Sequence, residues 1–468
     1  MRPEEALLKN FPFEPTNDQA ALFKKLDVFI SNKTDQRPTF LLKGFAGTGK
    51  TTVVRALVKI LNQFGYKYLL LAPTGRAAKV MSSYTRMPAS TIHKKIYRQS
   101  ANAFSDGLVF NRQPNKLGDT IFIVDEASMI SDEKAFGDSG LLQDLIAYVF
   151  EKKNNKLLLI GDTAQLPPVN QTISPSLEAD YLTNNFNCHV QQIELRQVMR
   201  QAQESGILMN ATSLREQLRQ GVPDLKLKTR NYKDVYRMTG EKLEDGLRYA
   251  YDKFGVESTT VICRSNKNAN LYNQHIRRQI FFAEDEIGVG DYLMIVRNNY
   301  FWVPPESHIG FMANGDFVEI TKIVRYEDMY EFRFADVQIR FVDYPEEPEM
   351  EVKILLDTLY TEAPALPADK SKQLYNEVLK DYSDLGTKRE RMEQLKKNPY
   401  LQALQVKFAY ALTCHKAQGG QWKAVFVDHG FLKEDMVNTD FARWLYTAIT
   451  RSAEELYLLN FNPQLLVD

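Results

Sequence analysis

Short apolar runs alternate with amphipathic helical patterns along most of this 468-residue chain. Such alternation is typical of βαβ units, whose strands form parallel sheets. In the first part it predicts a helix over Lys50–Phe64 and strands at Phe40–Lys43, Tyr68–Ala72, Thr120–Val124 and Lys156–Ile160. Farther along it predicts a strand at Thr259–Cys263, a helix over Asn266–Phe281, a strand at Ala424–Asp428, a helix over Phe441–Ile449 and a strand at Glu455–Asn460. The fold class is therefore α/β.

The segment between the predicted helix over Asn266–Phe281 and the predicted strand at Ala424–Asp428 has a different pattern. A turn at residues 314–316 leads into short β-like runs at Phe317–Ile323 and Tyr330–Phe334, and Asp369–Lys397 is a charged helical stretch interrupted at residues 383–386. Because the α/β pattern resumes afterwards, an insertion within a second domain explains the segment better than a separate domain. The predicted boundaries are 1–190 for the first domain, 191–314 with 406–468 for the second, and 315–405 for the insertion.

Composition narrows the classes of function. Lys plus Arg and Asp plus Glu both number 59, so the net charge is zero and binding by bulk positive charge is excluded, although a local basic groove is not. The three cysteines form no CxxC pair, which argues against a disulfide framework or a structural zinc site and fits a reducing cytoplasm. No apolar run approaches the roughly 18 residues of a membrane span. We expect a soluble, cytoplasmic protein.

Residues 44–51, GFAGTGKT, match the phosphate-binding pattern GxxxxGK[ST] between a predicted strand and a predicted helix. Glycines allow a tight loop whose amides wrap phosphates, Lys50 is expected to reach the β- and γ-phosphates, and the Thr51 hydroxyl to coordinate Mg²⁺. The predicted nucleotide-binding residues here are Gly44, Ala46, Gly47, Thr48, Gly49, Lys50, Thr51 and Thr52.

Two further apolar strands end in polar groups. Asp125 and Glu126 follow one strand, and we predict that Asp125 holds Mg²⁺ while Glu126 polarises the attacking water. Alone, such a pair equally fits a cap on the next helix. Gln165 follows the next strand and can hydrogen-bond the γ-phosphate, although the adjoining Pro167-Pro168 also fits a stiff turn. All these groups lie at carboxyl ends of strands, where open α/β sheets bind ligands.

Several segments, in the order given below, resemble the motifs of superfamily 1 helicases, which are P-loop ATPases of the AAA type. The fit is best to superfamily 1B, the RecD-like and Dda-like branch. They are GFAGTGKTT, LAPTGRAAK, VDEAS, GDTAQLPPV, LRQVMRQ, TCHKAQGG and YTAITR. The resemblance extends from about Phe13 to Asn460. It implies two RecA-like domains with ATP between them, a small β-hairpin insertion at about residues 99–119, and an SH3-like plus helical insertion in the second domain.

The same resemblance assigns roles to three more residues. Arg200 and Arg451 match arginine fingers, which would stabilise the transferring phosphoryl group from the second domain. Gln19 matches the adenine-reading position, yet Thr16-x-x-Gln19 also fits a helix capping box. One departure is Gln421-Trp422, where many family members carry a glutamate, so a ribose contact from an acid is not expected there.

The family also binds single-stranded DNA across both domains. The positions that contact the DNA backbone in the family correspond here to Pro73, Thr74, Thr91, His93, Thr413, His415 and Lys416. For the two histidines a structural hydrogen bond in a turn fits equally, and Tyr97, Phe301 and Trp302 fit either base stacking or the core. The hairpin matches the family's pin that splits duplex DNA, with Phe104, Leu108 and Phe110 as its apolar candidates, and a surface loop is the alternative.

We therefore expect an ATP- and Mg²⁺-dependent DNA helicase that moves as a monomer along single-stranded DNA, with 5′→3′ polarity implied by the resemblance. Three alternatives remain open: a translocase that strips proteins from DNA without separating strands, a nucleotide-switched binding module with little turnover, and an enzyme whose substrate is RNA.

Overall fold

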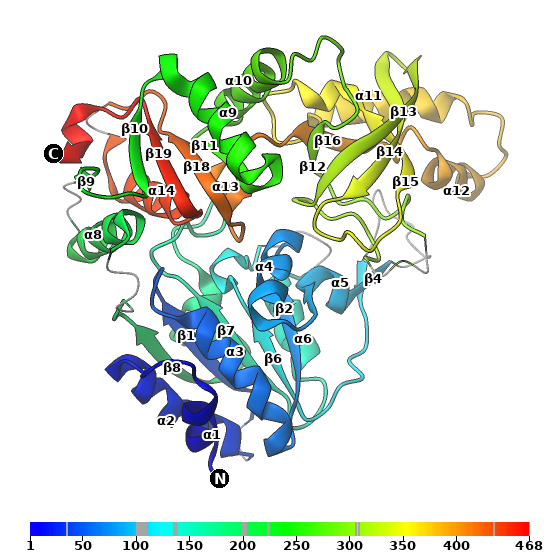
Figure 1. Cartoon of the computed structure of the whole chain (residues 1–468). Helices are drawn as coiled ribbons and strands as arrows, with labels where there is room; N and C mark the ends of the chain where they lie inside the picture. Colours follow the sequence, from blue (N-terminus) through cyan, green and yellow to red (C-terminus); the bar gives the residue numbers. More distant parts are fainter. Residues whose placement is uncertain are drawn as a thin grey trace.

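The computed structural model describes residues 1–33, 36–99, 110–133, 139–198, 204–221, 225–304, 307, 309–433 and 436–467. The chain forms two parallel sheets and one closed barrel. Figure 1 shows the first sheet at the bottom, with the second sheet and the barrel side by side above it. This arrangement confirms the expected fold class, two RecA-like α/β domains with a barrel and helical insertion.

The first domain is built on a six-stranded parallel sheet of order β3-β2-β6-β7-β1-β8. Its strands are β1 (Pro38–Gly44), β2 (Lys67–Ala72), β3 (Ala89–Thr91), β6 (Thr120–Val124), β7 (Lys156–Gly161) and β8 (His189–Leu195). Its helices are α1 (Pro3–Asn10), α2 (Asn17–Ser31), α3 (Lys50–Ile60), α4 (Gly75–Thr85), α5 (Ile92–Ile96), α6 (Leu141–Val149) and α7 (Ala179–Phe186). The central strands β6 and β7 are buried along their whole length, as strands with helices on both faces must be.

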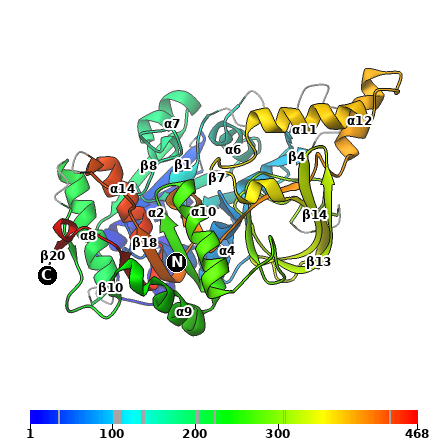
Figure 2. The ribbon, with the colours of Figure 1, turned by 90° about the horizontal axis from the view of Figure 1, so that it is seen from above.

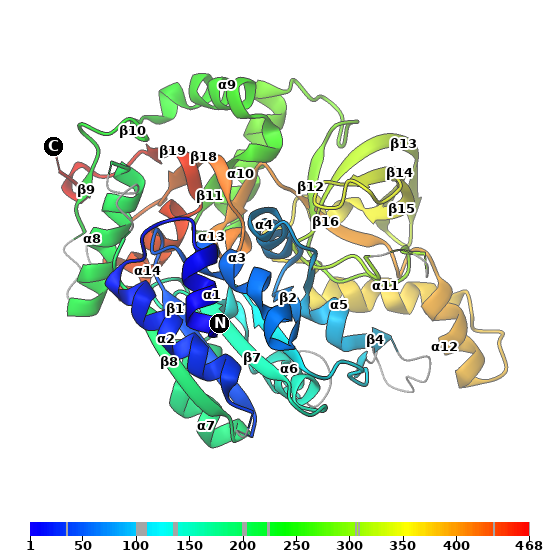
Figure 3. The same cartoon turned by 60° about the horizontal axis from the view of Figure 1, so that its bottom comes forward.

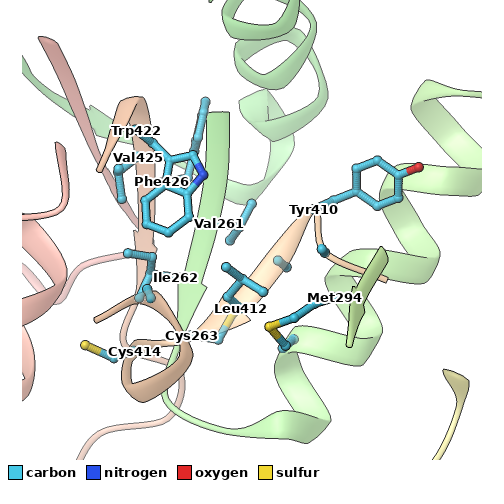
Figure 4. Packing of buried hydrophobic residues seen from close by; sticks show 14 of the residues in the cluster. Val261, Ile262, Cys263, Met294, Tyr410, Leu412, Cys414, Trp422, Val425 and Phe426 are labelled. Atoms are coloured by element: carbon cyan, nitrogen blue, oxygen red, sulfur yellow. The ribbon is translucent and has the colours of Figure 1, made fainter. Parts of the chain in front are cut away.

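The second domain is built on a five-stranded parallel sheet of order β10-β19-β18-β11-β17. Its strands are β10 (Val235–Met238), β11 (Thr259–Cys263), β17 (Ala411–Thr413), β18 (Trp422–Asp428) and β19 (Ser452–Leu459). Its helices are α8 (Gly206–Gln220), α9 (Leu243–Phe254), α10 (Asn266–His275), continued by a π-helix at Ile276–Ile280, α13 (Cys414–Ala417) and α14 (Thr439–Ile449). Figure 4 shows the apolar side chains of β11, β17 and β18 that form the core of this sheet.

The inserted barrel closes in the order β12-β13-β14-β15-β16. Its strands are β12 (Tyr292–Ile295), β13 (Phe317–Met329), β14 (Phe332–Phe341), β15 (Met350–Leu355) and β16 (Leu404–Phe408). Helices α11 (Ala368–Lys380) and α12 (Lys388–Lys397) extend from it, as Figure 2 shows, and pack their buried Leu374, Val378 and Leu395 against Phe332 and Phe334.

Two boundaries differ from those predicted. Strand β8 pairs with β1 and so extends the first domain to Leu195, past residue 190. Strands β12 and β16 pair with each other, so the barrel includes residues on both sides of 315–405. Both differences come from pairing between distant segments, which a local hydrophobic pattern does not encode.

Two short strand pairs complete the described part. Strands β4 (Tyr97–Gln99) and β5 (Phe110–Arg112) pair antiparallel, and β9 (Leu227–Lys228) pairs parallel with β20 (Leu466–Val467). None of the helices in the described residues has the length and apolar character that crossing a bilayer requires.

Arg76 on α4 joins all three parts of the molecule. Its guanidinium donates to Asp343 Oδ1 of the barrel at 3.0 Å and to the Glu257 carbonyl of the second domain at 3.2 Å. It also lies over the rings of Phe317 and Trp422, 5.2 and 5.0 Å from their centroids. A cation buried among these groups fixes the first domain against the other two parts.

This junction predicts a stability effect. Asp343→Asn leaves the buried Arg76 cation without its counter-charge and should destabilise the protein by about 3 kcal/mol, lowering the midpoint of thermal unfolding. Glu319→Gln is the matched control, because its partner Arg340 is half exposed and such a pair contributes less than about 1 kcal/mol. Equal midpoints for the two variants would contradict the assigned role of the junction.

Candidate functional site

A glycine-rich loop connects the end of β1 to the start of α3, as predicted. Gly47 and Gly49 adopt left-handed backbone conformations that strain other residues. The Lys50 amino group donates to the carbonyl oxygens of Gly44 and Phe45, at 2.6 and 3.0 Å. The predicted nucleotide-binding stretch therefore forms one tight turn at a helix N-terminus, where amides and the helix dipole favour an anion.

Gln19 ties the first turn of α2 to this loop. Its Oε1 accepts from the Thr16 amide at 3.0 Å, and the Thr16 hydroxyl accepts from the Gln19 amide, so the capping box is formed. Its Nε2 donates to the Thr48 carbonyl at 3.0 Å, and the side chain is buried. Both polar atoms thus already have partners, and a contact with adenine stays a prediction that needs one of them to be shared or released.

Asp125 and Glu126 follow β6 at the carboxyl edge of the first sheet. Glu126 has a φ of +51°, unusual for a residue with a side chain, and such strain is typical of functional positions. Burial, and then the charge of Glu126, raise the pKa of Asp125, while hydrogen bonds and the Lys50 cation oppose the shift. Tyr84 donates one of those bonds, to Asp125 Oδ2 at 2.6 Å.

Asp162 and Gln165 follow β7 at the same edge. Asp162 is buried, its Oδ1 accepts from the Ala164 amide at 2.9 Å, and burial raises its pKa against the influence of Lys50. The Gln165 side chain is buried too, and its Oε1 has no hydrogen-bond partner within the described part of the chain. Toward a phosphate oxygen only the Gln165 Nε2 group can act as the donor, whereas Oε1 can accept from a water.

Arg451 brings a cation from the second domain to these carboxylates. It follows α14, is buried, and its Nη1 lies 3.7 Å from Glu126 Oε1. Donation to the Thr447 and Gly420 carbonyls, at 3.1 and 3.3 Å, holds the side chain in place. Arg200, the other predicted finger, lies outside the described residues.

Other second-domain groups at the loop escaped the sequence analysis. Arg215 on α8 lies 4.5 Å from the ring centroid of Phe45, and its buried Nη1 has no hydrogen-bond partner among the described residues. Tyr446 on α14 accepts a hydrogen bond from the Ala46 amide at 3.0 Å. Figure 3 shows α14 next to the end of β1 that carries the loop. The only sequence signal was that Tyr446 begins the YTAITR motif.

Thr447 and Gln418 attach the second domain to the segment that follows β7. The Leu166 amide donates to Thr447 Oγ1 at 2.9 Å, and Gln418 Nε2 donates to the Leu166 carbonyl at 2.8 Å. Leu166 directly follows Gln165. A displacement of the Gln165 backbone would therefore strain the bonds of Leu166 to Thr447 and Gln418.

The residues of the first domain that were predicted to contact DNA lie directly after β2, at the end of β3 and in α5. The hydroxyls of Thr74, next to Pro73, and of Thr91 accept amide hydrogen bonds in the first turns of α4 and α5, at 3.2 Å each. Each hydroxyl keeps its hydrogen for another acceptor. Burial lowers the pKa of His93 to about 4, so this ring is neutral at pH 7.

The predicted contacts of the second domain lie where β17 passes into α13. Thr413 is the last residue of the strand and precedes the helix. Desolvation lowers the pKa of His415, and it lowers that of Lys416 to about 8. The Lys416 amino group donates to Asn314 Oδ1.

Gly419 brings these two sets of turns together. It has a positive φ, and a Cβ there would lie 2.8 Å from Ala77 Cβ and 3.3 Å from Thr74 Oγ1. Only glycine therefore permits this approach without a shift. Trp422, of the Gln421-Trp422 pair, packs its ring against the Arg76 guanidinium, 5.0 Å from the ring centroid.

The three aromatic candidates have different settings. Tyr97 donates to Asp144 Oδ2 at 2.7 Å, and Trp302 donates to the Gln402 carbonyl at 2.7 Å, so both are anchored within the protein. Phe301 is 39% exposed and is the most accessible of the three for stacking.

The pin candidates fall largely outside the described residues. Strands β4 and β5 pair antiparallel on either side of residues 100–109, which supports a hairpin here. Phe104 and Leu108 lie in the part that is not described, and Phe110 is placed in β5 by its backbone alone.

Comparison with known proteins gives two family matches. Residues 24–238 match a model described as an AAA domain, and residues 408–459 match the UvrD-like helicase C-terminal domain. The two matches contain the phosphate loop and Arg451 respectively.

Individual relatives span very different shares of their own length. The chain is 24% identical to protein R530 of Acanthamoeba polyphaga mimivirus, over 92% of this chain and 97% of that protein. It is 33% identical to the ATP-dependent RecD2 DNA helicase of Deinococcus radiodurans, over 37% of this chain and 21% of that protein. A crystal structure of the Pif1 helicase from Bacteroides, in complex with ADP-AlF3 and single-stranded DNA, is 15% identical, with a TM-score of 0.45, covering 97% of this chain and 95% of that one.

The bonds of Gln19 predict an indirect role in nucleotide binding. Gln19→Ala removes the link to Thr48 and should lower the affinity for ATP and for ITP by the same factor, about 5- to 10-fold, measured by calorimetry. Gln143→Ala, an exposed position on α6, should change neither affinity. A loss confined to ATP would instead show that the side chain reads the exocyclic amine of adenine.

Proposed function

We propose that this chain is an ATP-dependent DNA helicase of superfamily 1B that moves 5′→3′ along single-stranded DNA as its two α/β domains close and reopen around ATP. The observation that carries the proposal is the set of polar contacts across the domain boundary, foremost Arg451 beside Glu126. Because the two residues come from different domains, a hydrolysis-competent site exists only when the domains approach.

The described residues support a separate role in ATP hydrolysis for each group. Lys50 binds the β- and γ-phosphates, and Glu126 accepts the proton of the water that attacks the γ-phosphorus as the bond to the leaving ADP oxygen breaks. Arg451 neutralises charge on the transferring phosphoryl group, and we propose the same role for Arg200, which lies outside the described residues. Gln165 bonds to the γ-phosphate, and its release after hydrolysis frees the adjoining Leu166 segment.

The oxygen donors near the loop fit Mg²⁺. Thr51 lies in the first turn of α3 and Asp125 at the end of β6, and a hydroxyl with one carboxylate is the sparse protein ligand set that this ion takes when phosphates complete its shell. The ion would neutralise phosphate charge. Among the described residues, no group of three or more His, Cys, Asp or Glu side chains could hold a metal by itself.

The nucleic-acid strand is proposed to lie across the turns that carry Thr74, Thr91, Thr413 and Lys416. Hydroxyls and one cation suit sequence-independent contact with a phosphate backbone. Alternating grip by the two domains then converts each ATP cycle into a step along the strand. We propose that a monomer suffices, since both halves of the site come from one chain, and the three buried thiols fit a reducing compartment such as the cytoplasm.

The proposed base predicts a catalytic defect without a binding defect. Glu126→Gln should lower the DNA-stimulated kcat for ATP hydrolysis by about 10²- to 10⁴-fold while nucleotide affinity stays within a few-fold of wild type. Asp180→Asn on α7 is the control and should leave kcat unchanged. Comparable turnover by Glu126→Gln and wild type would rule out the assigned role.

Direction and substrate are tested together with forked or tailed duplexes. Strand separation should occur on duplexes with a 5′ single-stranded tail and not on those with only a 3′ tail, with ATP and Mg²⁺ present. Preference for the 3′ tail would reverse the proposed polarity. Efficient unwinding only of RNA-tailed substrates would replace DNA by RNA, and displacement of a bound protein without unwinding would favour a translocase.

A further inference from the structure

The hydroxyl of Tyr446 lies between two functional segments of the other domain. Tyr446 is fully buried in α14 of the second domain. Its Oη accepts from the Ala46 amide of the phosphate loop at 3.0 Å and donates to Asp162 Oδ2, at the end of β7, at 2.6 Å. One oxygen atom therefore links the loop, the strand end before Gln165, and the second domain.

Both partners depend on this hydroxyl. Asp162 uses its other oxygen for the Ala164 amide, so among the described residues Tyr446 is the side-chain donor to Oδ2. Burial, followed by the charge of Asp162, raises the pKa of Tyr446 well above its usual value, so the hydroxyl keeps its proton and remains a donor. Removing it would leave a buried amide and a buried carboxylate oxygen unsatisfied, an expensive change.

The same helical turn carries Arg451 to its place. The Thr450 hydroxyl donates to the Tyr446 carbonyl at 2.8 Å, and Arg451 Nε donates to the Thr447 carbonyl at 3.1 Å. The position of the guanidinium beside Glu126 is therefore set by the backbone of residues 446–450 together with the Gly420 carbonyl. Any rotation or withdrawal of α14 moves both Tyr446 and Arg451.

We propose that Tyr446 is a positioning residue for ATP hydrolysis: its hydroxyl holds α14 against Ala46 and Asp162, and thereby aligns Arg451 with Glu126. This inference rests on the proposed function and adds a residue to it. The Tyr446 hydroxyl bonds to Ala46 and Asp162, and its proposed effect on hydrolysis passes through Arg451. A ring that served only to fill space would be replaced by phenylalanine without consequence.

Tyr446→Phe removes the hydroxyl and keeps the ring. With saturating single-stranded DNA, its kcat for ATP should fall about 10- to 100-fold, while KM for ATP changes less than about threefold. Tyr457→Phe is the matched control, because this tyrosine is also buried in the second domain and also donates to a carboxylate, Glu455, at 2.6 Å. Its kcat should remain within twofold of wild type.

A double-mutant cycle separates positioning from general destabilisation. Arg451→Ala should lower kcat much less in the Tyr446→Phe background than in wild type, because the finger is already misaligned there. Asp162→Asn, which leaves one acceptor oxygen for the Ala164 amide and the Tyr446 hydroxyl together, should also lower kcat and should be non-additive with Tyr446→Phe. Thermal midpoints of all variants show whether each is folded, and Asp162→Asn carries the test if Tyr446→Phe is not.

The possible results distinguish a failure of the positioning role from a failure of the proposed function. An unchanged kcat in Tyr446→Phe, or effects of Tyr446→Phe and Arg451→Ala that simply multiply, overturns the positioning role while DNA-stimulated hydrolysis by wild type still supports the proposed function. A wild-type protein without DNA-stimulated hydrolysis contradicts the proposed function and this inference with it.

Discussion

The phosphate loop and Arg451, the arginine beside Glu126, belong to different domains, and the molecule is organised around bringing them together. Lys50 and Glu126 lie at carboxyl ends of the first sheet, whereas Arg451 follows the helix packed on the second. The two charged groups lie 3.7 Å apart across the domain boundary, so this ion pair exists only while the two domains are close together. In the proposed function, this constraint makes ATP hydrolysis depend on the relative position of the two domains, as a motor requires.

A continuous series of contacts leads from this boundary to the barrel. The Arg451 carbonyl accepts from the Trp422 amide at 3.0 Å, and the Trp422 ring packs against Arg76. Arg76 in turn pairs with Asp343 of the barrel. The nucleotide site and the three-part junction thus share Trp422, so a shift of the second domain cannot leave the barrel contact untouched. The sheet edges that carry Thr74 and Gly419 meet beside the same junction.

Local elements were largely predictable from the sequence. Strands β6 and β11 have the predicted bounds, because continuous apolar runs specify buried parallel strands, and the predicted helix over residues 50–64 is α3 followed by a 3₁₀ turn. The phosphate loop was also predictable, because its glycines and lysine are contiguous. Elements that depend on pairing between distant segments were not predictable. Examples are the addition of β8 to the first sheet and the closure of the barrel by β12 and β16. Tyr446 and Arg215 escaped notice for the same reason, since their partners lie about 400 and 170 positions away.

Single-turnover hydrolysis by Arg451→Ala, with single-stranded DNA bound, tests most directly whether the site is completed across the two domains. The account predicts nucleotide affinity within a few-fold of wild type and a hydrolysis rate lower by about 10³-fold or more, the contribution typical of an arginine finger. A variant that hydrolyses bound ATP at the wild-type rate would contradict it.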